Sequence, residues 1–368
     1  MMEAPENPPR GPAAFASLED PEAVQAQAAI LLAVGAEMSG DRAAVQGMSA
    51  AAAQPMDMLL ADELEEFPIP RLVPPGRRMS PRVAMERRYG RNEPRMMVQI
   101  AEDLYRTRSS TAAAALAHAA MEHPHELVRV AAAHAALAVT TEPAQPYAIL
   151  VEGTSSEDEL TRDVAATALA RYNPEDPALR ALVGEPELPT PGIAHTSTLV
   201  HGTWAANGTW WPPNGNFWDY IDQNVWLNDL YANNDYYKWS GGYSRGARDQ
   251  GADLLTTWIN AHGVNDLSLM AHSHGASVTM LASWRGVTFG RVVFLSSPVH
   301  PSLYNMNFAA VQKVTSIRVK MDLVLLADRS GARFSDPRYN EHVLPVWFNH
   351  SATHDPAVWV RHNVPTML

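Results

Sequence analysis

The segment Ala271-His-Ser-His-Gly275 holds the residues best suited to covalent chemistry in this chain of 368 residues. It lies between an apolar run and a stretch with helical spacing, which places Ser273 on a sharp strand-to-helix turn. Such a turn needs small residues two positions to either side, and Ala271 and Gly275 supply them. The amino end of the following helix favours the negative charge that forms during acyl transfer. Because the chain has no cysteine, serine is the strong candidate for the nucleophile.

This segment resembles the nucleophile elbow of the α/β-hydrolase superfamily, with Ala271 where the first glycine usually stands. Earlier in the chain, His201-Gly-Thr203 is similar to the turn that contributes one backbone N–H of the oxyanion hole in lipases. The resemblance covers about residues 195–366. It implies that the backbone N–H groups of Thr203 and His274 form the oxyanion hole.

In this superfamily the acid and then the base follow the nucleophile along the chain. Asp322 comes directly at the end of an expected strand and is our expected acid, whereas Asp328 is expected to be a turn residue beyond reach. The pair Asp355-Pro356 predicts the start of a final helix. His350 would then lie in the loop before that helix and is the expected base, and His354 would be a cap or surface residue.

Five short runs rich in β-branched and apolar residues predict strands, each ending in a polar cluster: Ser197–Val200, Asp266–Met270, Arg291–Leu295, Ser316–Lys320 and Val343–Phe348. Helical patterns lie between them, notably Arg245–Ala261 and Ala276–Arg285. This alternation predicts a mostly parallel, doubly wound sheet with its chemistry at the carboxyl ends of the strands. The expected fold class is therefore α/β, an α/β-hydrolase fold, preceded by an all-α domain.

Charge and tryptophan divide the chain into two expected domains, residues 1–190 and 191–368. The first holds 28 acidic and 16 basic residues, the second 12 of each, so the net charge of -12 belongs to the first. All ten tryptophans follow residue 200, and six lie in an insertion over residues 204–240. These aromatic residues suit either a pocket wall over an acyl chain or the core of the domain. The Pro-punctuated stretch 185–192 is the expected linker.

The first half is rich in alanine and predicts helices, beginning with Pro21–Met38 after Asp20 as N-cap. Arg71–Arg95 contains eight arginines without interleaved aromatic residues, which favours a solvated connector over a nucleic-acid site. Residues 126–133 and 159–166 are similar in sequence. This repeated pattern resembles HEAT-like repeats, and a packed helical bundle explains it equally well. A protein partner or self-association is expected for this half.

Composition excludes several classes of function. The absence of cysteine excludes disulfides, thiolate nucleophiles and Cys-ligated metals. The acidic balance argues against nucleic acid or an anionic membrane as partner. A metal site on His272 and His274 is disfavoured because the turn at Ser273 directs the two side chains apart, so neither metal nor cofactor is expected. The start lacks a positively charged signal region, and the apolar run Ala28–Gly35 is too short to cross a membrane, which predicts a cytoplasmic protein.

The leading functional hypothesis is a serine hydrolase that cleaves a small-molecule or lipid ester. Ser273 would attack, His350 would transfer the proton, Asp322 would orient the imidazole, and the amides of Thr203 and His274 would hold the oxyanion. An acyltransferase or thioesterase would use the same residues. The alternative from another class is a non-catalytic interaction protein in which a helical module is joined to a hydrolase-like scaffold.

Overall fold

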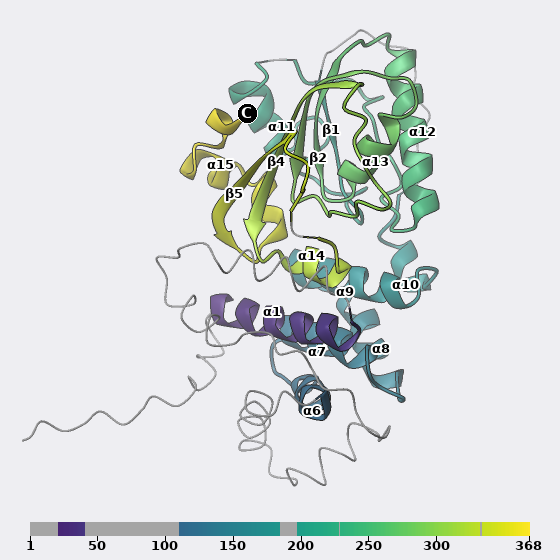
Figure 1. Cartoon of the computed structure of the whole chain (residues 1–368), viewed down its shortest axis with the longest axis vertical. Coiled ribbons are helices and arrows are strands. Elements are labelled where there is room, and N and C mark those ends of the chain that lie inside the picture. The colour runs from purple at the N-terminus through teal and green to yellow at the C-terminus, as the bar shows by residue number, and fades with distance from the viewer. Residues whose placement is uncertain (1–20, 41–109, 185–196, 228, 332) are drawn as a thin grey trace, which may run out of the picture.

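The computed structural model describes residues 21–40, 110–184, 197–227, 229–331 and 333–368 (Figure 1). Before residue 185 the described residues form only helices: α1 (Pro21–Met38), α6 (Ser110–Ala120), α7 (Glu126–Leu137), α8 (Ala144–Gly153), α9 (Glu159–Tyr172) and α10 (Pro177–Arg180). The first of these has the bounds expected from the sequence. Asp20, the arginine-rich stretch 71–95 and the linker 185–192 lie outside the described residues.

Small residues let the helices of the first half approach one another closely. A Cβ added to Gly35 of α1 would lie 2.8 Å from the Cα of Ala135 in α7, and one added to Gly153 of α8 would lie 2.7 Å from Val130. The two similar segments of the sequence both begin helices, with Glu126 first in α7 and Glu159 first in α9. Whether these helices form HEAT-like repeats stays a prediction.

The second half contains a five-stranded sheet in which all neighbouring strands are parallel. Its strands are β1 (Ser197–Val200), β2 (Leu267–His272), β3 (Phe289–Leu295), β4 (Val311–Lys320) and β5 (Tyr339–Trp347), in that spatial order. The five expected strands are all present, and the mixed α/β class is confirmed. β4 and β5 begin several residues before their expected starts, where polar residues hide the strand pattern.

Helices cover both faces of this sheet (Figure 1). On one face, α12 (Arg245–Ala261) and α13 (Gly275–Ala282) pack on Leu269 and Phe294. On the other, α11 (Asn216–Asn224) and α15 (Pro356–Arg361) pack on Met270 and Leu295. Successive strand residues therefore face opposite cores, which is why β2 and β3 consist mainly of apolar residues.

The direction of winding changes at β1. Leu230, in the segment between β1 and β2, makes an isolated parallel bridge to Ser197. Ser197 also pairs with Ser268 of β2, so Leu230 lies along the other edge of β1. After β1 the chain thus runs along one edge of that strand and then crosses to its other edge, where it forms β2. Ligand sites of open parallel sheets form at such a switch point, beside the carboxyl ends of the two strands.

A short helix, α14 (Leu323–Asp328), joins the two halves. Leu323, Val324 and Leu326 belong to the same apolar core as the buried residues of α1, α7 and α9. Beyond β5 the chain forms the 3-10 turns η1 (His350–His354) and η2 (Val364–Met367), on either side of α15. Within the described ranges, no helix has the length and hydrophobicity needed to cross a lipid bilayer.

The tryptophan-rich insertion supplies core residues. Trp211 and Trp239 are almost completely buried, as is Phe217 of α11. Trp239 Nε1 donates to the carbonyl of His201 at 2.8 Å, and Trp211 Nε1 donates to that of Ala205 at 2.7 Å. These side chains therefore hold the loop after β1 in place, which favours the core interpretation of the insertion for them.

Candidate active site

Ser273 lies at the turn between β2 and α13 with a strained backbone. Its φ is +52°, in the left-handed region that residues other than glycine rarely adopt. The N–H of Ser273 donates to the carbonyl of Leu295 on β3 at 2.8 Å. A Cβ added to Gly275 would lie 2.6 Å from the carbonyl oxygen of His201 and 2.8 Å from that of Val200. The turn thus requires glycine at this position, as its sequence pattern predicts.

The loop after β1 lies directly against this turn. A Cβ added to Gly202 would lie 2.7 Å from the Cβ of Ser273, so Thr203 follows a residue in contact with the serine. Within the described part of the chain, neither the N–H of Thr203 nor that of His274 donates to a backbone or side-chain acceptor. Two backbone donors beside a serine are the components of an oxyanion hole.

Asp322 and His350 form a buried pair at the carboxyl ends of β4 and β5. Nδ1 of His350 lies 2.8 Å from both carboxylate oxygens of Asp322, and the exposed fractions of the two residues are 2% and 5%. Asp322 is also the N-cap of α14, where Oδ1 accepts from the N–H groups of Val324 and Leu325. The carboxylate is therefore fixed by the backbone on one side and orients the imidazole on the other.

The charge of this pair favours a basic imidazole. Burial by itself would lower the pKa of His350, but the carboxylate of Asp322 outweighs it through charge and hydrogen bonding, so the pKa is raised above its ordinary value. With Nδ1 held by Asp322, Nε2 is the nitrogen left for a proton from a substrate or nucleophile.

The contact between the turn that holds Ser273 and the side chain of His350 is made by His272. The ring of His272, the residue before Ser273, has its centroid 4.6 Å from that of His350. No hydrogen bond joins Ser273 and His350 among the described residues, and Ser273 is 3% exposed. Catalytic hydrogen bonds are often long without substrate and shorten when it binds. The structure therefore brings Asp322 and His350 into contact and packs His272, the residue before Ser273, against His350.

His354 does not lie at the surface, so that expectation is wrong. It is 6% exposed, and its ring stacks on Trp210 with centroids 4.0 Å apart. Burial lowers its pKa to about 3, and burial also lowers the pKa of His272 well below its ordinary value. Both rings are neutral at pH 7. The ring of His272 packs against His350, and the ring of His354 packs against His272.

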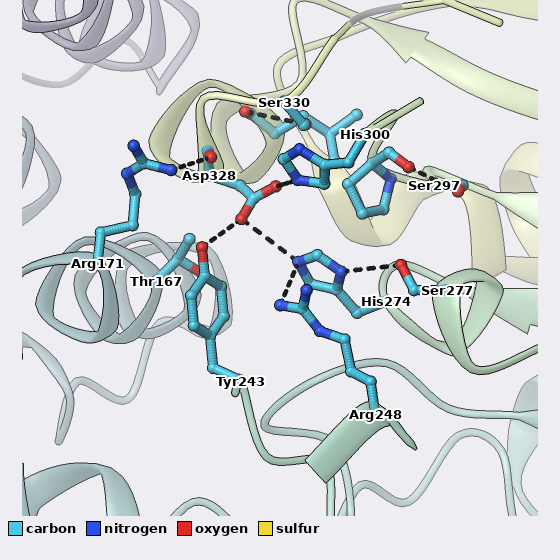
Figure 2. A network of polar contacts seen from close by, with 12 residues as sticks. Thr167, Arg171, Tyr243, Arg248, His274, Ser277, Ser297, His300, Asp328 and Ser330 are labelled. Atoms are coloured by element: carbon cyan, nitrogen blue, oxygen red, sulfur yellow. Dashed lines mark hydrogen bonds and ion pairs between the residues drawn. The ribbon is translucent and has the colours of Figure 1, made fainter. Parts of the chain in front are cut away.

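Asp328 is a second buried carboxylate, and local sequence did not reveal its role. It is 2% exposed at the end of α14, where its Oδ1 accepts from the hydroxyl of Tyr243 and its Oδ2 lies 2.7 Å from Nε2 of His300 (Figure 2). Oδ1 also lies 3.3 Å from Nε2 of His274. The expectation of a turn residue is wrong because the apolar run before Asp328 carries it into the core. The apolar run Leu323–Ala327 was the feature of the sequence that could have predicted the burial of Asp328.

This cluster fixes the side chain of His274, whose backbone N–H is one of the two donors expected for the oxyanion hole. Nε2 of His274 accepts from Nη2 of Arg248 at 3.1 Å, and Nδ1 lies 3.2 Å from the hydroxyl of Ser277 (Figure 2). Burial, followed by the charge of Arg248, lowers the pKa of His274 to about 3, so its ring is neutral at pH 7. His272 and His274 have separate surroundings, and the turn directs them apart.

The charge of Asp328 is compensated by its neighbours. Burial would raise the pKa of this carboxyl, but its contacts with His274 and His300 outweigh burial and hold the pKa well below its ordinary value. The buried guanidinium of Arg248 adds a cation at Nε2 of His274, the same nitrogen that lies against Asp328. Asp328 is therefore ionised at neutral pH and acts as the anion of this network.

His274, His300 and Asp328 are also a set of residues that a metal ion could use, because one ligand atom of each lies within 4.8 Å of the others. The donor set does not favour a cation. Arg248 directs its positive charge at the His274 nitrogen that a metal would need, and Asp328 already accepts from Tyr243 and His300. We therefore assign the cluster to hydrogen bonding rather than to metal binding.

Comparisons with known proteins give little beyond this geometry. No family model matches the chain, and no curated protein matches it in sequence. Among solved structures, the chain is similar to lipase B of Aspergillus fumigatus, with 14% sequence identity, coverage of 86% of this chain and 83% of that chain, and a TM-score of 0.33. A similarity at this level does not extend to activity or substrate.

Proposed function

We propose that this chain is a serine hydrolase that cleaves carboxylic esters, as an esterase or lipase, through an acyl-enzyme on Ser273. One observation carries the proposal: His350 bonds both carboxylate oxygens of Asp322 at 2.8 Å, beside a serine held at φ +52° between strand and helix. A buried Asp–His pair next to a strained serine is the arrangement that activates a hydroxyl for nucleophilic attack.

The reaction would proceed in two halves. In the first, the hydroxyl of Ser273 attacks the carbonyl carbon while Nε2 of His350 takes its proton, and the N–H groups of Thr203 and His274 stabilise the oxyanion. The C–O bond to the alcohol then breaks, and His350 returns the proton to the leaving oxygen. In the second half, water repeats the attack and frees Ser273. Asp322 stabilises the imidazolium in both halves.

We further propose that residues 191–368 form an α/β-hydrolase domain and that residues 1–190 form a helical domain attached to it. The support is the parallel sheet, the change of winding at β1, and the location of Ser273, Asp322 and His350 beyond the carboxyl ends of β2, β4 and β5. Side chains at these ends meet along one edge of the sheet.

A fluorophosphonate probe tests the proposal because it reacts with an activated serine. The full chain should be labelled once, at Ser273 by mass spectrometry, and Ser273→Ala should remove both the label and hydrolysis of a short p-nitrophenyl ester. Ser302→Ala, at an exposed serine, is the matched control and should keep both. A folded wild-type chain that takes no label and cleaves no ester would sink the proposal and favour the non-catalytic scaffold.

Two related reactions would use the same residues as ester hydrolysis. Thioesterases and acyltransferases use the same nucleophile, acid and base. A series of oxygen esters and thioesters of increasing chain length, assayed in water and with added alcohol, separates them. Faster turnover of thioesters, or transfer to the alcohol in preference to water, would replace ester hydrolysis by that reaction.

A further inference from the structure

One face of α9 carries a row of polar residues at intervals of four: Glu159, Asp163, Thr167 and Arg171. Residues at this spacing lie one above another on a helix. α9 belongs to the first half of the chain, in which no catalytic residue was expected. Each of these side chains nevertheless faces a segment of the candidate active site.

The lower part of the row contacts the two segments around the oxyanion hole. The hydroxyl of Thr167 lies 3.5 Å from Nε1 of Trp204, the residue after Thr203, at the long end of hydrogen-bond range. Nη1 of Arg171 donates to the carbonyl of Asp328 at 2.7 Å (Figure 2). Asp328 is the anion of the network that holds His274.

Apolar packing holds α9 against the acid and the base. Val164 and Ala168 of α9 share one core with Leu323, the residue after Asp322, and with Phe348, two residues before His350. The N–H of Leu323 donates to the carbonyl of Phe348 at 3.1 Å. α9 therefore packs on α14, which begins directly after Asp322, and α14 is joined by this hydrogen bond to the segment before His350.

The upper part of the row lies toward the start of α14, where Asp322 holds His350, because α9 packs along α14 and Arg171 meets Asp328 at the other end of α14. Asp163 is half-buried, and burial raises its pKa to about 7, while the nearby charge of His350 acts in the opposite direction. In turn, Asp163 and Glu159 act after Asp322 to raise the pKa of His350. The rings of His272 from β2 and His354 from η1 also lie near His350, and both are neutral at pH 7. The buried guanidinium of Arg318 on β4 interacts by charge with Asp322.

We propose that α9 is a wall of the active site and that Asp163 is a positioning residue, a second carboxylate that acts with Asp322 to stabilise protonated His350. This inference rests on the proposed function for its meaning in catalysis. The helical half is then part of the catalytic unit rather than a separate docking module.

Loss of the charge of Asp163 should change the titration of His350. Removing the charge of Asp163 weakens proton binding to the imidazole, so the pKa of His350 falls. A fall of about 0.5 to 1 unit is a change of about three- to tenfold in proton affinity. In ester hydrolysis, Asp163→Asn should extend activity to lower pH by the same shift. Its plateau rate should fall several-fold because the imidazolium is less stabilised.

An NMR titration of histidine ring signals in the full chain tests this without relying on turnover. The signal of His350 is assigned by its loss in His350→Gln. In Asp163→Asn its pKa should fall, and in Glu159→Gln, at an exposed site that tolerates the change, it should fall by less. Glu175→Gln removes the same charge from an exposed residue beyond the end of α9 and should leave the titration unchanged.

The outcomes separate the two proposals. A His350 titration that is unchanged in both Asp163→Asn and Glu159→Gln overturns the role of α9, whatever the activity of the chain. A shifted titration in a chain that takes no fluorophosphonate label upholds the contact with α9 and overturns ester hydrolysis. Equal shifts in Glu175→Gln would mean a general charge effect and would also overturn the role of Asp163.

Discussion

Substitution of Asp328 by alanine measures what the buried network contributes to stability. The change removes the acceptor of Tyr243 and His300 and the anion closest to His274 and Arg248. The remaining side chains stay buried, with Arg248 only 5% exposed. Removing one partner of a buried ionic network costs about 3–5 kcal/mol, because the uncompensated charge remains. We expect the free energy of unfolding to fall by that amount at pH 7.

Urea unfolding followed by tryptophan fluorescence is a suitable assay, because all ten tryptophans lie in the half that contains Asp328. Asp328→Asn should lose less than Asp328→Ala, since the amide keeps an acceptor for Tyr243 and loses only the charge. The matched control is Asp336→Ala. That carboxylate pairs with Arg338 at 2.6 Å but in solvent, so its loss should cause no measurable change.

The stabilisation by Asp328 should also change with pH in a defined direction. The pKa of Asp328 is lower in the folded chain than its ordinary value, so its stabilisation is present above about pH 4 and is lost as the pH falls further. The gap between wild type and Asp328→Ala should therefore narrow in acid. A gap below about 1 kcal/mol at pH 7, well under the expected cost of an uncompensated buried charge, would refute the reasoning.

Two further substitutions address the reacting groups. Asp322→Asn should keep the cap of α14 and lower kcat for ester hydrolysis by about 10⁴-fold, because His350 loses the anion that orients it; wild-type turnover with unchanged circular dichroism would contradict this. Gly275→Ala should lower the free energy of unfolding by about 1–3 kcal/mol and slow labelling of Ser273, since its Cβ would lie 2.6 Å from a backbone carbonyl oxygen. Labelling at the wild-type rate would show that the turn tolerates a side chain.

Local signals predicted the secondary structure where they were strong. The helix Arg245–Ala261 has the expected bounds because Ser244 caps it, accepting from the N–H of Ala247 at 3.1 Å. The start of α15 was expected from Asp355, whose carboxylate caps the helix by accepting from the N–H of Ala357. The start of β5 was missed because Asn340 and Glu341 are polar and gain their strand conformation by pairing with β4.

The sequence alone determined the strand-to-helix turn at Ser273 and the two small residues that this turn needs. These features depend on residues a few positions apart, which propensity and capping control. Only the tertiary structure decided where Asp328 and α9 lie and which side chains they meet. Asp328 meets His274, Tyr243 and Arg171 across 54, 85 and 157 positions of the chain. Such contacts exist only once the apolar core has brought these segments together, so no local pattern encodes them.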